Sequence, residues 1–231
     1  MLSKGSAIRS PSLPYVGPFV LFLILLALSR VAPFPEWLVQ SGFVAIMLVA
    51  IAMLAPRAWD LQHGFRVRHG TGTVLLGFLV FVIWIAPDLL VPGYRHSWLF
   101  KNALLGSAEP GLSIGAHGQA AILSLRAFRA VAIVPLVEEL FWRAWLMRWL
   151  ISVHFLKIPL GTWSAGAFWI VAVLFASEHG AYWDTGLAAG VLYNWWMVRT
   201  RSLADLMLAH AVTNACLSAY VVIAGKWEYW S

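Results

Sequence analysis

Two adjacent glutamates, Glu138 and Glu139, lie in an otherwise apolar stretch of the chain and are followed by Arg143. The stretch is hydrophobic enough to lie within a bilayer, where a charged side chain at mid-depth costs about 2.5 to 3.5 kcal/mol on insertion scales. Ionisable residues kept at such a depth usually have a function. The glutamate pair is therefore the first candidate for a chemical role.

The spacing gives the two glutamates different roles. Glu139 and Arg143 are four residues apart, so on a helix they share a face in the order that favours an ion pair. Glu138 is rotated by about 100° from Glu139 and has no cation one turn away. We therefore expect Glu139, neutralised by Arg143, to support the site, and Glu138 to be the free carboxylate that can take a proton.

Two further pairs of residues have the same helical spacing. His210 and Asn214 are four residues apart, as are Phe175 and His179, and each pair lies on one face of a helix. A single intramembrane His or Asn is often only a hydrogen-bond partner between helices. Four polar positions on three spans, however, supply a base, two imidazoles and an amide donor. These are the groups that water-mediated hydrolysis of an acyl bond needs.

The composition indicates an integral membrane protein. Of the 231 residues, 61% are hydrophobic and 11% are charged, whereas a soluble domain has about 25% charged residues. The net charge of +6 comes from Lys and Arg in short stretches between apolar runs. These stretches lack the basic aromatic face that binds a phosphate backbone, so we expect no nucleic acid partner. Cys216 is the only cysteine, which excludes an internal disulfide.

The apolar runs predict an all-α fold, a bundle of about seven transmembrane helices around an intramembrane polar cavity. A span needs about 20 mostly apolar residues. The run at 119–153 is longer, and we expect it to be one span with an amphipathic extension on which Arg126 and Arg129 share a polar face. We expect one integral membrane domain over 1–231, with its motif-bearing core at about 119–224. The expected spans are 15–32, 37–55, 73–91, 119–153, 161–177, 186–198 and 203–224.

The basic residues predict the orientation in the membrane. Cytoplasmic loops are enriched in Lys and Arg, and seven spans with a cytoplasmic N-terminus place most of these residues inside. We therefore expect a cytoplasmic N-terminus. The inner side would hold Lys4, Arg9, Arg57, Arg66, Arg68, Arg148, Lys157, Arg199 and Arg201, and the outer side Arg30, Arg95, Lys101 and Lys226.

At its polar positions the chain resembles the CAAX prenyl protease and bacteriocin-processing (CPBP) family of intramembrane endopeptidases. Three short motifs match in the family's order. They are Glu138-Glu139-Leu-Phe-Trp-Arg143 for Glu-Glu-x-x-x-Arg, Phe175-Ala-Ser-Glu-His179 for Phe-x-x-x-His, and His210-Ala-Val-Thr-Asn214 for His-x-x-x-Asn. The resemblance covers roughly the C-terminal half. The length and the Trp-rich C-terminal half look most like the branch of CAAX-protease-related proteins that accompanies bacterial exosortase and PEP-CTERM sorting systems. This resemblance implies the inner (cytoplasmic) membrane of a bacterium.

The resemblance implies a mechanism that agrees with the spacing. Glu138 would be the general base that activates a water, His179 would help to orient and deprotonate that water, and His210 with Asn214 would stabilise the oxyanion. The structural support of the site would come from Glu139, Arg143 and Phe175. No cofactor is implied. The partners would be the lipid bilayer and a peptide or protein substrate, and family members that cleave CAAX proteins act on a lipidated, prenylated C-terminus.

Three alternatives remain open at this point. Glu138, His179 and His210 are a plausible ligand set for a catalytic zinc with water in the fourth position, although no His-Glu-x-x-His motif is present. Gly111-Leu-Ser113-Ile-Gly115 fits the Gly-x-Ser-x-Gly pattern of serine hydrolases, which requires a turn between a strand and a helix. The third alternative is a protein without catalysis, either a membrane partner or immunity-type protein or a small transporter whose buried charges line a substrate path.

Overall fold

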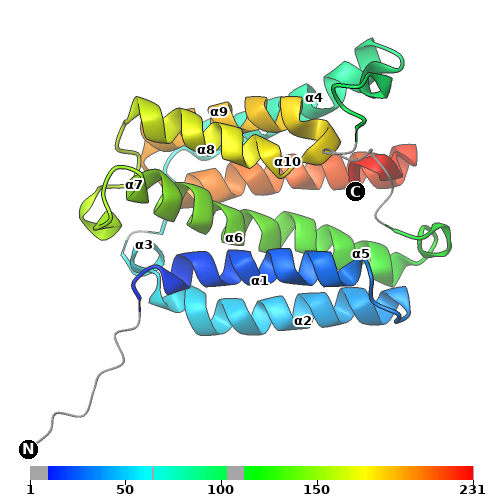
Figure 1. The fold of residues 1–231 in the computed structure, drawn as a ribbon, viewed down its shortest axis with the longest axis horizontal. Helices are drawn as coiled ribbons and strands as arrows, with labels where there is room; N and C mark the ends of the chain where they lie inside the picture. Colours follow the sequence, from blue (N-terminus) through cyan, green and yellow to red (C-terminus); the bar gives the residue numbers. More distant parts are fainter. Residues whose placement is uncertain (1–9, 64, 103–111, 231) are drawn as a thin grey trace, which may run out of the picture.

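The computed structural model describes residues 10–63, 65–102 and 112–230, and these ranges contain helices and no strands. The long helices pack side by side as a bundle (Figure 1). The α-helices of the described ranges are α1 (Leu13–Ser29), α2 (Glu36–Leu54), α3 (Trp59–Gln62), α4 (Gly70–Leu90), α5 (Ala120–Phe128), α6 (Val134–Glu139), α7 (Met147–Trp149), α8 (Ala165–Ser177), α9 (Trp183–Thr200) and α10 (Leu203–Ala224).

The predicted all-α class is confirmed, and the predicted count of seven spans is approximate. Each expected span corresponds to one long helical segment. By length and composition, four of these segments could cross a membrane on their own, namely 36–57, 70–90, 120–149 and 203–224. The helices α1 and α8 are apolar but shorter. Several apolar helices of this kind identify an integral membrane protein.

The outward faces of the bundle are apolar. Large hydrophobic side chains are exposed on several helices, for example Leu75 on α4 at 64%, Val49 on α2 at 59% and Val173 on α8 at 56%. Water would disfavour contiguous apolar surfaces of this size, whereas lipid chains would cover them.

The segment at 119–153, in which we expected one span, forms a single helical run over 120–149. Two π-helical stretches interrupt it, at Arg129–Ile133 and Leu140–Leu146. Pro135 follows the first stretch, and its ring would clash with the carbonyl oxygen four residues earlier in a regular α-helix. A wider π turn relieves that clash, and such turns are frequent at functional sites. The short helix α6, which ends with Glu138 and Glu139, lies between the two stretches.

Glycines allow the helices that carry the polar motifs to approach one another. A Cβ atom on Gly77 would lie 2.4 Å from the carbonyl oxygen of Ala209, which places α4 directly against α10. A Cβ atom on Gly190 would lie 3.1 Å from the carbonyl oxygen of Ala172, which joins α9 to α8. Small residues at such crossings let backbones pack closely in membrane proteins. The motif helices α8 and α10 are thereby held against their neighbours.

Candidate active site

The expected ion pair between Glu139 and Arg143 forms inside the bundle. Both side chains have no exposed surface, and Arg143 Nη1 lies 3.1 Å from each carboxylate oxygen of Glu139. Arg143 Nε donates to Asn194 Oδ1 on α9 at 2.9 Å, and the guanidinium lies 4.4 Å from the centre of the Phe175 ring on α8. The pair therefore ties the glutamate helix to both α8 and α9, which agrees with a supporting role.

Glu139 also contacts His210, which the helical spacing did not indicate. His210 Nδ1 lies 2.8 Å from Glu139 Oε1. A carboxylate can only accept, so Nδ1 carries the proton and the second ring nitrogen, Nε2, is left for the cavity. Glu139 thus orients an imidazole as well as balancing Arg143. Its position in the motif alone could not reveal this, because His210 is 71 residues away in the chain.

His179 is fixed by the backbone of its own motif. Its Nδ1 lies 2.7 Å from the carbonyl oxygen of Phe175, one turn earlier. A carbonyl oxygen also only accepts, so Nδ1 is protonated and Nε2 can act as an acceptor. Gly186 leaves room for the ring, because a Cβ atom there would lie 3.1 Å from His179 Cγ. The motif spacing therefore sets the tautomer of His179.

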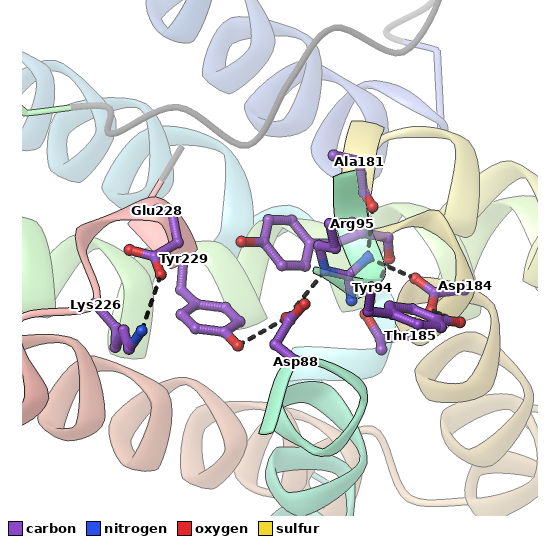
Figure 2. A network of polar contacts seen from close by, with 10 residues as sticks. Asp88, Tyr94, Arg95, Ala181, Asp184, Thr185, Lys226, Glu228 and Tyr229 are labelled. Carbon is purple, nitrogen blue, oxygen red and sulfur yellow. Dashed lines mark hydrogen bonds and ion pairs between the residues drawn. The ribbon is translucent and has the colours of Figure 1, made fainter. Parts of the chain in front are cut away.

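A polar network holds the turn that follows His179 (Figure 2). Buried Arg95 donates to the carbonyl oxygen of Ala181 at 2.6 Å, and it forms ion pairs with Asp88 on α4 at 3.0 Å and with Asp184 on α9 at 2.9 Å. Tyr229 donates its hydroxyl to Asp88 at 2.8 Å. The network fastens α4, the start of α9 and the C-terminal turn at Trp227–Trp230 to one another.

Asn214 points toward the glutamate helix. Its Nδ2 donates to the carbonyl oxygen of Ala130 at 2.8 Å, within the π-helical stretch at Arg129–Ile133. A side-chain amide has two N–H groups, so one remains for another acceptor. The π turn thus supplies the carbonyl that positions Asn214.

A cavity of about 230 Å³ brings the expected catalytic residues together. Glu138, His179, His210, Asn214 and Phe175 all line it, whereas Glu139 and Arg143 lie behind its wall. Among the described residues, no group forms a hydrogen bond with Glu138 Oε2, although this oxygen is buried. Buried polar atoms are rarely left without a partner, so this oxygen is suited to bind a water or a reacting group.

The cavity wall includes residues that the motifs did not indicate. Tyr193 and Thr213 line it and are hydrogen-bonded to each other at 2.8 Å. Glu178, for which the sequence gave no role, lies at the wall with an exposed side chain. Their recognition required the packing of α9 and α10, which a single sequence does not give.

Arg126 and Arg129 lie on one polar face as expected, but this face points into the bundle and not toward the membrane interface. Both line the cavity, with 8% and 4% of their surface exposed, whereas an amphipathic extension would have placed them at the membrane interface. Arg126 donates to the carbonyl oxygen of Trp230, and Arg129 lies 4.3 Å from the centre of the Phe43 ring. The polar face exists, but it is turned into the bundle.

The structure agrees with the alternative zinc site in one feature and disagrees with it in another. The sequence suggested no carboxylate behind the histidines, yet Glu139 lies behind His210, as carboxylates do in many zinc sites. Within the described ranges, however, no three His, Cys, Asp or Glu side chains are grouped so that they could hold one metal ion.

The serine motif has no supporting structure around it. Ser113 is exposed and precedes a short 3-10 turn at Ile114–Ala116, while Gly111 lies outside the described residues. The described part of the chain has no strand that could form the required elbow, and Ser113 is not among the residues of the cavity wall.

The sequence between residues 120 and 216 matches the family model described as type II CAAX prenyl endopeptidase Rce1-like. The chain contains an Rce1-like CAAX endopeptidase domain. All three motifs lie within the matched range, and the predicted resemblance to this family is thereby confirmed. The Rce1-like domain identifies the protein as a membrane peptidase in general terms. No curated protein and no solved structure matches the chain significantly.

Proposed function

We propose that this chain is an intramembrane endopeptidase that hydrolyses a peptide bond of a membrane-associated protein or peptide with a water activated by Glu138 and His179. The observation that carries the proposal is the buried, unpartnered Oε2 of Glu138 in a cavity that also contains His179, His210 and Asn214. The Rce1-like domain favours this reaction class over a partner protein without catalysis.

In the proposed reaction, the two hydrogen-bond acceptors of the cavity, Glu138 and His179, act on the attacking water. Glu138 Oε2 accepts the proton as the water attacks the scissile carbonyl carbon, and His179 Nε2 orients the same water. The proton is then delivered to the leaving amine, which restores the carboxylate. Support for this division comes from His179 Nδ1, which is committed to the Phe175 carbonyl and leaves only Nε2 free for the water.

The donors in the proposed reaction stabilise the tetrahedral oxyanion. His210 can donate from Nε2 when its ring carries both protons, and Glu139 Oε1, which accepts from Nδ1 at 2.8 Å, holds the ring in place. The second N–H of Asn214 supplies the other donor. Donors held in place before the reaction need no reorganisation as negative charge develops, which is why such groups contribute strongly to rate.

Asn214 provides one test of this arrangement. In Asn214→Ala, we expect kcat to fall by about 10²-fold, because the loss of one oxyanion donor costs about 10² to 10³ in rate. The KM should hardly change, because the oxyanion exists only in the transition state. Asn214→Asp should be at least as damaging, since a carboxylate repels the oxyanion. Steady-state kinetics of the purified variants measure both constants.

The result that would contradict an oxyanion role for Asn214 is a higher KM with a near-normal kcat and a lower melting temperature in detergent. Asn214 would then serve only as the hydrogen bond between α10 and the Ala130 carbonyl.

The alternative to a metal-free reaction is a zinc peptidase with Glu138, His179 and His210 as ligands. We expect activity to survive prolonged treatment with 1,10-phenanthroline, with the non-chelating 1,7-phenanthroline as the matched control, and elemental analysis to find no stoichiometric zinc. Selective inactivation by the 1,10 isomer, followed by recovery on adding zinc, would instead establish the metallopeptidase.

We also propose the setting in which the enzyme works. The basic residues favour a cytoplasmic N-terminus, and the resemblance to proteins of bacterial sorting systems favours a bacterial inner membrane. The substrate would be a lipidated or membrane-anchored peptide or protein. Reporter fusions at the N-terminus and in the 94–102 region would test the orientation. The three expected spans α1, α2 and α4 separate these positions, so the two reporters should lie on opposite sides of the membrane.

A further inference from the structure

Arg126 and Arg129 are buried arginines that lie outside the three motifs. The other buried arginines of the described ranges each form an ion pair with a carboxylate, Arg95 with Asp88 and Asp184, Arg143 with Glu139 and Arg148 with Asp60. Neither Arg126 nor Arg129 lies within 4.0 Å of a carboxylate oxygen of the described residues. The two therefore bring positive charge to the cavity wall with no ion-pair partner among the described residues.

The hydrogen bonding of the pair is also incomplete. Arg129 is 4% exposed, and its Nη1 is buried without a hydrogen-bond partner in the described part of the chain. Its contact with the Phe43 ring is a weak attraction, which does not offset the cost of burying a charge without a partner. Within the described ranges, Arg126 donates to a neutral carbonyl, that of Trp230. A ligand that is negatively charged would satisfy both.

The two guanidinium groups suit a carboxylate. Arg126 and Arg129 are three residues apart on one helical run, so their side chains are neighbours. Guanidinium groups offer planar pairs of N–H donors that match the two oxygens of a carboxylate. Arg129 precedes Glu138 by nine residues, about 13 Å of helix, which is the length of about four residues of extended peptide.

We propose that Arg126 and Arg129 form a subsite for a carboxylate of the peptide substrate, placed within about four residues of the scissile bond. This inference rests on the proposed function in one respect, because it places the scissile bond at Glu138. Binding itself does not require turnover. The carboxylate comes either from the C-terminus of the substrate or from an acidic side chain near it, and the two sources differ in a simple binding experiment.

The experiment measures affinity on the full chain in detergent, in a Glu138→Gln background that removes turnover. The probes are dodecanoyl-Ala-Leu-Leu-Leu as the free acid and as the C-terminal amide. Their binding is measured by the change in fluorescence of the intrinsic tryptophans. We expect the free acid to bind about 10-fold more tightly, or better, since hydrogen bonds to charged groups contribute about 1.5 to 3 kcal/mol. A third probe, the amide with Glu as its last residue, distinguishes an acidic side chain from the terminal carboxylate as the source.

Arginine variants assign the preference to the subsite. Arg129→Gln should bring the acid-to-amide ratio close to one, and Arg129→Lys, which keeps the charge but loses the planar donor pair, should give an intermediate ratio. Arg199→Gln, at an exposed position on α9, is the matched control and should keep the full ratio. Melting temperatures identify a variant that fails to fold, and the Lys variant then carries the test.

Two outcomes would overturn the subsite. Equal affinities for the carboxylates and the neutral amide in folded protein, unchanged by Arg129→Lys, would make the arginines structural. An Arg129 effect that appears only in nanodiscs of phosphatidylglycerol, and not of phosphatidylcholine, would assign the pair to an anionic lipid headgroup. Because all binding is measured without turnover, a selective carboxylate site would stand even if no peptidase activity were found.

Discussion

Glu138→Gln should lower the rate of peptide cleavage by about 10³-fold or more, while the protein stays folded in detergent. General-base catalysis contributes about 10² to 10⁴ in rate, and the amide that replaces Glu138 cannot accept the proton of the attacking water. Folding should be little affected, because Oε2 has no hydrogen-bond partner among the described residues that the substitution would remove. The measurement is cleavage of a quenched fluorescent hydrophobic peptide by purified enzyme.

The matched control is Glu228→Gln. Glu228 belongs to the C-terminal turn, where it pairs with Lys226 at 3.7 Å at a partly exposed position, and it is not part of the cavity wall. The Glu228→Gln variant should cleave the peptide at the wild-type rate. Full activity in purified Glu138→Gln would remove the basis of the proposed mechanism, and a lack of activity in the wild type with every peptide tested would favour the partner protein without catalysis.

The sequence predicted the fold well where hydropathy alone decides the outcome. The apolar runs are long and separated by prolines, so the long helices of the described chain lie close to where they were expected. Hydropathy decided less well how many helices cross the membrane. The helix α8 has 13 residues, fewer than the roughly 20 of an ordinary span, and its neighbours must help to determine its depth.

The sequence predicted the residues of the cavity, but it predicted direct contacts between side chains only where one helix contains both partners. Glu139 and Arg143 are one turn apart, and their ion pair forms as expected. The bond between Glu139 and His210 joins two helices, so no spacing rule indicates it. The inward direction of Arg126 and Arg129 was also missed. The π turn at Arg129–Ile133 changes the rotation between these residues and Glu138, whereas faces drawn at 3.6 residues per turn assume that no such turn intervenes.

The role of Glu139 can be separated from that of Arg143 by a double variant. In Glu139→Gln, the guanidinium of Arg143 would remain buried without a counter-ion, which costs about 3 to 5 kcal/mol. We expect the melting temperature in detergent to fall by on the order of 10 °C. The kcat should also fall by about 10²-fold, because His210 Nδ1 would lose the carboxylate that holds the ring, and the oxyanion would lose a donor kept in place.

Adding Arg143→Met to Glu139→Gln should restore most of the stability and none of the activity. An apolar side chain of similar length removes the unpaired charge, and replacing a buried ion pair in this way is often close to neutral. The recovery should be incomplete, since Asn194 Oδ1 loses the donor that Arg143 provides. His210 would still face an uncharged amide, so kcat should stay about 10²-fold below wild type. If activity instead returned together with stability, Glu139 would be needed only to balance Arg143, and the positioning of His210 by its carboxylate would not contribute to catalysis.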